Sequence, residues 1–324
     1  MITLEQSKAG RTDKVEQKVI DMFLKKSEVL ELLPFANDVS PNGGSTLTYG
    51  YVQEKTPSMA AFRAIGKEYD PNEATVEPKS VNLAVFGGSF EIDRIIKTIE
   101  GQLNNMAFQL EQKISAAVGL FHDTMINGDV TQEVNGFDGL DKFLVGTENE
   151  LNTDGVIDLS TSAKITENAS AFYEMLTKLL NDTSAHAIFC NADMKTKIQT
   201  VARELGYQTQ TEEAFGRKIT NIDGVRIIDL GNTYSVNEGK VTKTPIINKV
   251  TRGENTNVTD IYAVKFDVND GFHGVTITGD DVVQQYLPDF KTPGALKKGE
   301  VEMIACVALK NANNAGVLRN IKIA

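Results

Sequence analysis

Residues 92–128 read IDRIIKTIEGQLNNMAFQLEQKISAAVGLFHDTMING, and this stretch carries the strongest pattern in the chain. Its large apolar residues recur at steps of three and four, the spacing that places side chains on one face of an α-helix. They are Ile92, Ile95, Ile96, Ile99, Leu103, Met106, Leu110, Ile114, Val118, Phe121 and Met125. Asp93 near the start and Asn127-Gly128 at the end suit the two termini of a helix. A helix over 92–127 would be roughly 50 Å long, so the sequence predicts a long helix that can act as a spine.

Two strand patterns precede this helix. Residues 45–52 and 80–86 alternate apolar side chains with polar or small ones, as half-exposed strands do. The segment between them is polar and contains three prolines: Pro57, Pro71 and Pro78. We expect Gly87-Gly88 to end this excursion. A two-stranded arm has one layer and two open edges, so it must be stabilised by packing against something else, such as another copy of the chain.

The N-terminal segment has two parts. Residues 11–33 place apolar side chains near helical spacing among balanced charges, which predicts an amphipathic helix or arm that ends at Pro34. Residues 37–44 concentrate Asn, Asp, Ser, Pro and Gly, the residues that form turns. We therefore expect a hinge or linker there.

The second half of the chain alternates between helical and strand patterns. We expect helices at 172–179 and 194–205 and strands at 186–190 and 225–230, with Asn191 as a helix cap. This alternation predicts an α/β layer. Further strands are expected at 261–266, 275–278, 301–309 and 317–323, and the last two are expected to form a hairpin through the loop at 311–316.

The composition excludes several classes of protein. The 324 residues include 33 Lys+Arg against 44 Asp+Glu, and the resulting net charge of −11 argues against a broad basic surface for nucleic acid. There is no run of about 18 apolar residues and no basic and apolar leader, so we expect a cytoplasmic chain with protein partners and no membrane contact. Cys190 and Cys306 lie in apolar runs, which predicts buried free thiols and no disulfide.

Catalytic signatures are missing from the sequence. It has no G-x-S-x-G, no phosphate loop, no G-x-G-x-x-G, no H-E-x-x-H and no C-x-x-C. His122, His186 and His273 are far apart in sequence, and we expect each to be packed or on the surface. Residues 267–271 lack the glycine position and the closing glutamate of a calcium loop, so a turn is predicted. We therefore predict no catalytic, cofactor-binding or metal-binding residues and no enzymatic activity.

This order of elements resembles the major capsid protein of tailed bacteriophages, which has the HK97-like capsid fold shared with encapsulin shells. The turn NGFDGL at 135–140 is similar to the N-G-x-x-G-L-like turn of that family, and VEMIAC at 301–306 resembles its closing peripheral strand. The resemblance implies an α+β fold with an N-terminal arm, an extended β-hairpin loop (E-loop), a long spine helix in a peripheral domain, and an axial α/β domain.

The same resemblance implies a division of the chain into five parts. These are an N-terminal arm and hinge at 1–44, the E-loop at 45–89, a peripheral domain with the spine helix at 90–153, the axial domain at 154–281, and return strands of the peripheral domain at 282–324. Some capsids of this family cross-link a loop lysine to an asparagine of a neighbour. Nothing selects one of Lys55, Lys67 and Lys79 for this role, so we predict no such bond.

The resemblance also implies a function. It indicates a structural subunit of a phage capsid that self-assembles into hexamers and pentamers and encloses double-stranded DNA. The expected partners are other copies of the chain, a scaffolding protein and a portal, with a decoration protein as a further candidate. The expected location is the virion capsid, assembled in the host cytoplasm. Two alternatives remain open: an encapsulin-type nanocompartment shell with enzyme cargo, and a cytoplasmic α/β enzyme with an acidic site at Asp280, Asp281 and His273.

Overall fold

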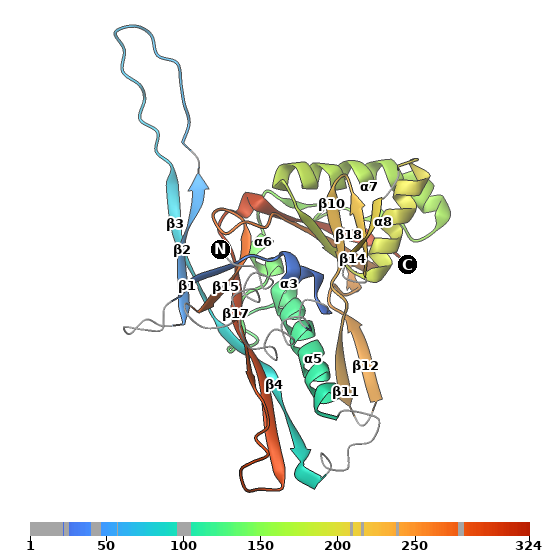
Figure 1. Cartoon of the computed structure of the whole chain (residues 1–324). Helices are drawn as coiled ribbons and strands as arrows, with labels where there is room; N and C mark the ends of the chain where they lie inside the picture. The colour runs from blue at the N-terminus through green and yellow to red at the C-terminus, as the bar shows by residue number, and fades with distance from the viewer. Residues whose placement is uncertain are drawn as a thin grey trace.

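The computed structural model describes residues 22, 26–39, 47–56, 58–95, 105–207, 210–214, 217–237, 240–277 and 282–324. Figure 1 shows an elongated molecule with a thin arm, formed by β2 (Thr48–Thr56) and β3 (Thr75–Asn82), that projects away from the rest. Helices α7 (Ser162–Thr183) and α8 (Ala192–Glu204) lie in one half of the body, and α5 (Asn105–Asn127) runs through the other half.

The half around α5 is built on a five-stranded sheet. Its strand order is β1-β15-β17-β16, and β4 also pairs with β17. The bounds are β1 Phe35–Val39, β4 Ala84–Asp93, β15 Phe272–Ile277, β16 Val283–Tyr286 and β17 Leu296–Leu309. Helix α5 buries Ile114 and Met125 completely, and its Phe121 ring stacks on Phe86 of β4 with the ring centroids 5.7 Å apart. Packing of this amphipathic helix against the sheet therefore forms the core of this half.

The other half is a nine-stranded sheet covered by two helices. The strand order is β5-β18-β14-β7-β10-β9-β8, with β13 on β14 and β6 on β18. The bounds are β5 Glu150–Leu151, β6 Ile157–Asp158, β7 Ala187–Cys190, β8 Gln210–Ala214, β9 Arg217–Ile222, β10 Val225–Asp229, β13 Val250–Arg252, β14 Asn255–Val264 and β18 Ala315–Lys322. Side chains of one sheet face pack with α7 and α8, while those of the other face join the core around α5.

Shorter elements complete the fold. They are α3 (Glu28–Leu32), α6 (Leu140–Leu144), the 3-10 turn Ala312–Asn314, and a hairpin of β11 (Asn232–Asn237) and β12 (Lys240–Pro245) that contacts α5. No helix among the described segments is both long enough and apolar enough to span a bilayer.

The long helix was predicted to begin two residues too early. Ile92 and Asp93 belong to β4, which pairs with β17 over ten residues, whereas Arg94 and Ile95 are helical. Residues 96–104 lie outside the described part of the chain, and α5 is described from Asn105. Gly87-Gly88 does not end the strand either. A Cβ atom on Gly87 would lie 1.9 Å from the carbonyl oxygen of Val301, so glycine is required for the close approach of β4 and β17.

The C-terminal strands also differ from the prediction. β17 and β18 do not form a hairpin, because β17 pairs with β15 in the five-stranded sheet while β18 pairs with β14 in the nine-stranded sheet. Of the strands in the segment 282–324, β16 and β17 lie in the five-stranded sheet and β18 lies in the nine-stranded sheet. In turn β15, which fell within the predicted axial segment 154–281, lies in the five-stranded sheet. Both differences depend on which distant strands pair with each other, and the apolar pattern of a single sequence does not identify these partners.

Other predictions were confirmed or revised locally. The patterns at 172–179, 186–190, 194–205, 225–230 and 261–266 correspond to α7, β7, α8, β10 and β14. Asn191 caps α8, since its Oδ1 accepts a hydrogen bond of 2.8 Å from the backbone N–H of Met194. At the N-terminus, α3 ends before Pro34 as predicted, but β1 occupies the start of the predicted hinge, and residues 40–46 are not described.

Candidate assembly surface

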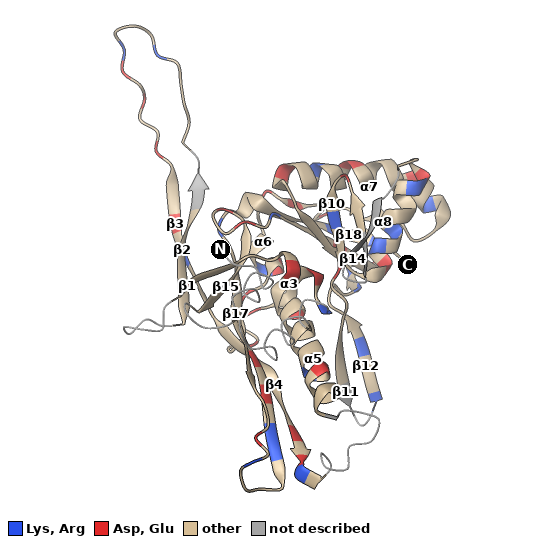
Figure 2. Cartoon of the chain, in the orientation of Figure 1, with Lys and Arg blue, Asp and Glu red and all other residues tan. Residues whose placement is uncertain are grey.

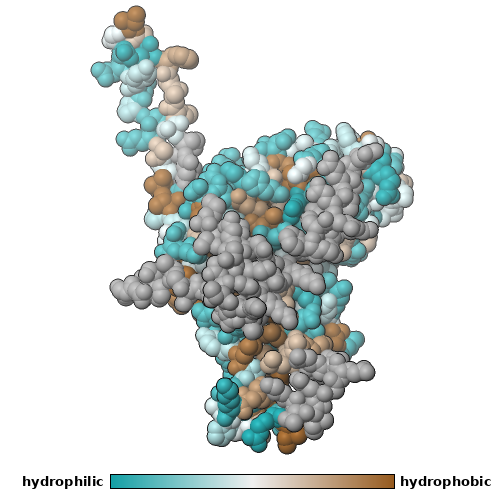
Figure 3. Space-filling view, in the orientation of Figure 1, coloured by the Kyte–Doolittle hydropathy of each residue, from teal (hydrophilic) through white to brown (hydrophobic). Residues whose placement is uncertain are grey.

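The outer part of the arm exposes large apolar side chains that no described residue covers. Residues 58–80 are exposed without exception, and within them Phe62 and Ile65 are 107% and 103% accessible. Met59, Tyr69 and Val76 are also exposed large side chains. Figure 3 shows hydrophobic side chains at the far end of the arm and again further down it. These side chains bury no apolar area within a single copy of the chain, so they mark a surface that a partner can cover.

Local contacts shape the end of the arm. The guanidinium of Arg63 lies 5.4 Å from the centre of the Tyr69 ring and donates a hydrogen bond of 3.1 Å to the carbonyl of Lys67. The backbone N–H of Met59 donates to Oδ1 of Asn72 across the loop, at 3.2 Å. These contacts close the loop without burying its apolar side chains.

The base of the arm, by contrast, is fixed to the body. Tyr49 is buried, stacks on Tyr51 with centroids 5.8 Å apart, and meets the edge of the His273 ring at the same distance. The ammonium of Lys310 lies 5.8 Å from the centre of the Tyr49 ring. Burial raises the pKa of Tyr51 to about 12. The arm therefore leaves the body from a packed aromatic cluster.

A buried histidine connects the N-terminal segment to α5. Nδ1 of His122 lies 3.0 Å from the carbonyl oxygen of Leu230, and its Nε2 lies 2.7 Å from Oγ of Ser27. A carbonyl only accepts, so Nδ1 carries the proton, and the Ser27 hydroxyl donates to Nε2 while accepting from the N–H of Leu30. Burial lowers the pKa of His122 to about 4, so the ring is neutral near pH 7. The expectation of a packed His122 is confirmed.

A charged cluster joins α6 to the nine-stranded sheet. Arg319 of β18 donates to Asp141 of α6 at 2.5 Å, to Glu150 at 2.7 Å and to Asp260 at 3.0 Å. Asp260 also accepts two hydrogen bonds from Arg252, at 2.7 and 2.6 Å. Burial alone would lower the pKa of Arg319, but the hydrogen bond to Asp141 and the surrounding negative charge raise it. The guanidinium therefore stays charged and holds α6 against the nine-stranded sheet.

Structural comparison places this architecture among shell proteins. The chain from the holo-SrpI encapsulin complex of Synechococcus elongatus PCC 7942 matches with a TM-score of 0.57 at 14% identity, over 91% of this chain and 87% of that one. The capsid of the empty GTA particle matches with a TM-score of 0.54 at 10% identity, over 92% and 90% of the two chains. The chain has the HK97-like capsid fold.

A third structure, from Microbacterium phage Oxtober96, matches with a TM-score of 0.53 at 9% identity, over 92% of this chain and 91% of that one. No family model and no curated protein sequence matches the chain. The likeness therefore lies in the arrangement of elements along nearly the whole chain, as the resemblance in element order had indicated.

Of the three residues considered for an acidic site, His273 alone lies in the described part of the chain. His273 is buried and its Nδ1 lies 3.1 Å from the carbonyl of Gly271, while Asp280 and Asp281 lie outside the described residues. Residues 267–271 form the predicted turn, between β14 and β15. Among the described residues, no three His, Cys, Asp or Glu side chains are placed to hold a metal ion. Cys190 and Cys306 are buried and free, as predicted, and burial raises the pKa of Cys306 to about 12.

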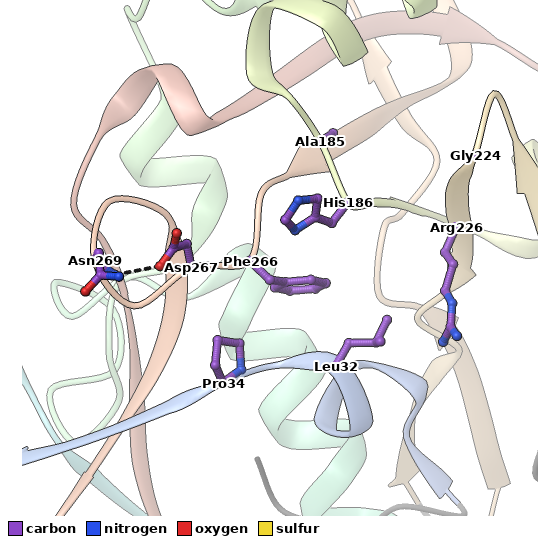
Figure 4. Close-up of a pocket in the computed structure, with 9 residues that line it drawn as sticks. All are labelled: Leu32, Pro34, Ala185, His186, Gly224, Arg226, Phe266, Asp267 and Asn269. Carbon is purple, nitrogen blue, oxygen red and sulfur yellow. Dashed lines mark hydrogen bonds between the residues drawn. The ribbon is translucent and has the colours of Figure 1, made fainter. Parts of the chain in front are cut away.

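His186 lines a cavity of about 660 Å³ between the end of α3, the start of β7 and the loop after β14 (Figure 4). Figure 4 shows the His186 ring above that of Phe266, with the Arg226 side chain extending away from both. Asp267 in the same cavity accepts a hydrogen bond from the backbone N–H of Asn269, at 2.9 Å. The site holds no arrangement of nucleophile and base, so the arm remains the stronger functional candidate.

Proposed function

We propose that the chain is a capsid subunit that assembles into hexamers and pentamers of an icosahedral phage shell enclosing double-stranded DNA. The observation that carries the proposal is the arm, whose apolar side chains have no covering layer within one copy of the chain. The shared fold with an encapsulin shell and the capsid of a GTA particle supports it. In this proposal the arm is the E-loop, α5 the spine helix, and the nine-stranded half the axial domain.

In a shell, the arm would lie over an adjacent subunit and acquire its missing second layer there. Burying one large apolar side chain contributes roughly 1.5–3 kcal/mol. The arm exposes five such side chains in its outer part: Met59, Phe62, Ile65, Tyr69 and Val76. Repetition of this contact around a ring involves each subunit in two contacts, once through its own arm and once through the surface that it offers, so a ring contains one such contact per subunit.

The net charge bears on what the shell would contain. A subunit with a net charge of −11 would repel packaged DNA wherever its acidic side chains line the interior. We expect a scaffolding protein and a portal to take part in assembly, and a decoration protein is a further candidate partner. We expect assembly in the host cytoplasm, after which the subunit is part of the virion capsid. A large basic surface on the inside of the shell would contradict the expected repulsion.

A second candidate function is an encapsulin-type compartment with enzyme cargo. The match to an encapsulin complex, at a TM-score of 0.57, favours it. The contents of purified particles separate the two candidates, since nuclease-protected DNA of uniform length indicates a virus and a co-purifying enzyme indicates a compartment. We expect no enzymatic activity from the chain itself, and no described residue supports an acidic catalytic site.

Electron microscopy and light scattering on the purified chain across a concentration series test the proposed function. We expect closed shells, or rings of five and six subunits. A chain that stays monomeric or dimeric at every concentration, even when a scaffolding protein is co-expressed, would contradict the proposal and return the enzyme hypothesis to first place.

A further inference from the structure

The five-stranded sheet has an acidic outward face. Alternation along β4 and β17 buries one set of side chains against α5 and points the other set away from it. The outward set includes three carboxylates, Glu91, Glu300 and Glu302, and one lysine, Lys298, which lies opposite Glu91; Val85 and Leu296 are exposed beside them. Glu300 pairs with Lys298, whereas Glu91 and Glu302 form no ion pair with any described residue.

This face also contains a notch. Gly87 lies opposite Glu302 in the β4–β17 register, and Ser89 lies opposite Glu300. Because the glycine has no side chain, a hollow of about 260 Å³ opens between Val85 and Ser89, with the two glutamates on its wall. A lysine side chain matches such a hollow, since its apolar stem can lie on the sheet while the ammonium meets carboxylates.

A basic hairpin lies on the other side of α5. In β11–β12, Tyr234 lies directly opposite Lys243, and Val241 shares its face because it is two residues away. Tyr234 and Val241 are 66% and 61% accessible, and Lys240 and Lys243 are exposed. Lys243 shares the face of Tyr234 and Val241, whereas Lys240, next to Val241, lies on the opposite face. Neither lysine forms an ion pair with a described residue. Figure 2 shows these basic positions on β12 and, across α5, both acidic and basic positions on β4 and β17.

We propose that hairpin β11–β12 of one copy docks on the acidic outward face of β4 and β17 of the next copy, with a hairpin lysine in the notch beside Glu302. This inference rests on the proposed self-assembly and names a contact separate from the arm. The two surfaces are complementary in charge, each has an apolar border, and they lie on opposite sides of one subunit. A contact of two different surfaces is heterologous, so it propagates from copy to copy and closes into a ring.

Charge reversal tests the pairing. The variant Lys240→Glu with Lys243→Glu reverses the one lysine on each face of the hairpin, and the variant Glu91→Lys with Glu302→Lys reverses two carboxylates of the sheet. Each variant therefore places like charges across the contact. We expect each pair of substitutions to raise the concentration needed for ring formation by about tenfold or more, measured by light scattering after size-exclusion chromatography. Lys178→Glu on the exposed face of α7 is the matched control and should assemble as the wild type does. All of these positions are at the surface, so thermal unfolding should remain cooperative.

Rescue identifies the partner. A chain with all four reversals restores opposite charges across every contact, so it should assemble at near wild-type concentrations. An equal mixture of the two double variants restores them where the variants alternate, so it should form rings of six but not rings of five. Assembly of either double variant at the wild-type concentration, or failure of both rescues, overturns the pairing. If only the Glu91→Lys and Glu302→Lys variant fails to assemble, another segment covers the acidic face and the hairpin is not its partner.

The failure of this inference can be told apart from failure of the proposed function. If the wild type forms closed shells while charge reversal has no effect, the inference is wrong and the proposed function stands. If charge reversal prevents ring formation but the rings of the wild type never close into shells, the inference stands and the proposed function is wrong. A wild-type chain that never self-associates overturns both.

Discussion

The arm and the nine-stranded half use apolar side chains in opposite ways. In the nine-stranded half, Phe172 and Leu176 of α7 are buried against the sheet, so one copy of the chain satisfies them. In the arm, Phe62 and Ile65 are fully exposed and no described residue covers them. The difference separates what is needed to fold from what is needed to assemble, and each can be disturbed without the other.

The largest effect is expected in the core that supports both regions. Leu110 of α5 is buried, so Leu110→Asp places a charge among apolar side chains and should cost about 4 kcal/mol or more, enough to unfold the subunit. Circular dichroism during urea unfolding measures this change. Gln112→Asp, on the exposed side of the same helix, should leave stability nearly unchanged. Equal effects of the two variants would show that α5 does not pack as described.

Removal of the arm should abolish closed shells and leave folding intact. Deletion of residues 52–79, with an Asn-Gly turn joining Tyr51 to Ser80, keeps the buried Tyr49 at the base. Below the assembly concentration, its unfolding free energy should match that of the wild type to within about 1 kcal/mol. Electron microscopy then reports on assembly. Normal shells from this variant would contradict the assignment of the arm as the E-loop.

The charged cluster that holds α6 against the nine-stranded sheet gives the next largest effect. Arg319→Ala removes the partner of three carboxylates, those of Asp141, Glu150 and Asp260. Breaking a buried charge network by loss of one member costs about 3–5 kcal/mol. Differential scanning calorimetry should show a lower midpoint. Lys164→Ala, which breaks an exposed pair with Glu167, should change stability by less than about 1 kcal/mol.

Acid should weaken the N-terminal contact to α5 by a smaller amount. The pKa of His122 falls from 6.5 in the unfolded chain to about 4 in the folded one, so the unfolded state binds more protons between these values. The contribution of the neutral ring is complete above pH 6.5 and is lost as the pH falls toward 4, for up to about 3 kcal/mol. Urea titrations at several pH values should show a shallower dependence in His122→Gln. An identical pH dependence in the two proteins would rule out this role of His122.

Periodicity predicted the helices that bury one face. The second part of the long helix and α8 were found because their apolar residues repeat at a regular step, whereas β7 and β10 were found as short apolar runs. The start of the helix was placed too early because Ile92 satisfies helical spacing, while pairing of β4 with β17 places it in a strand. The pairing of β18 with β14 could not be foreseen, since a strand pattern does not name its partner.

The candidate assembly surfaces were also predicted only in part. The arm was predicted because alternating side chains flank a polar, proline-containing stretch, and the lack of an internal layer followed from that pattern. Hairpin β11–β12 was missed, because threonine, asparagine and lysine dominate it and its strands bury little. Its signal in the sequence is the pattern NTYSVNEGKVTKTP at 232–245, in which a Glu-Gly turn separates two runs of β-forming residues.

The arm continues almost directly into a strand of the body. Leu83 alone separates β3 of the arm from β4, and β4 pairs antiparallel with β17 over ten residues, from Ala84 opposite Ala305 to Asp93 opposite Leu296. A pull along the arm therefore loads this ladder in shear, and its hydrogen bonds resist together instead of opening one after another. The exposed arm is thus anchored in the body through the strand pairing that withstands tension best.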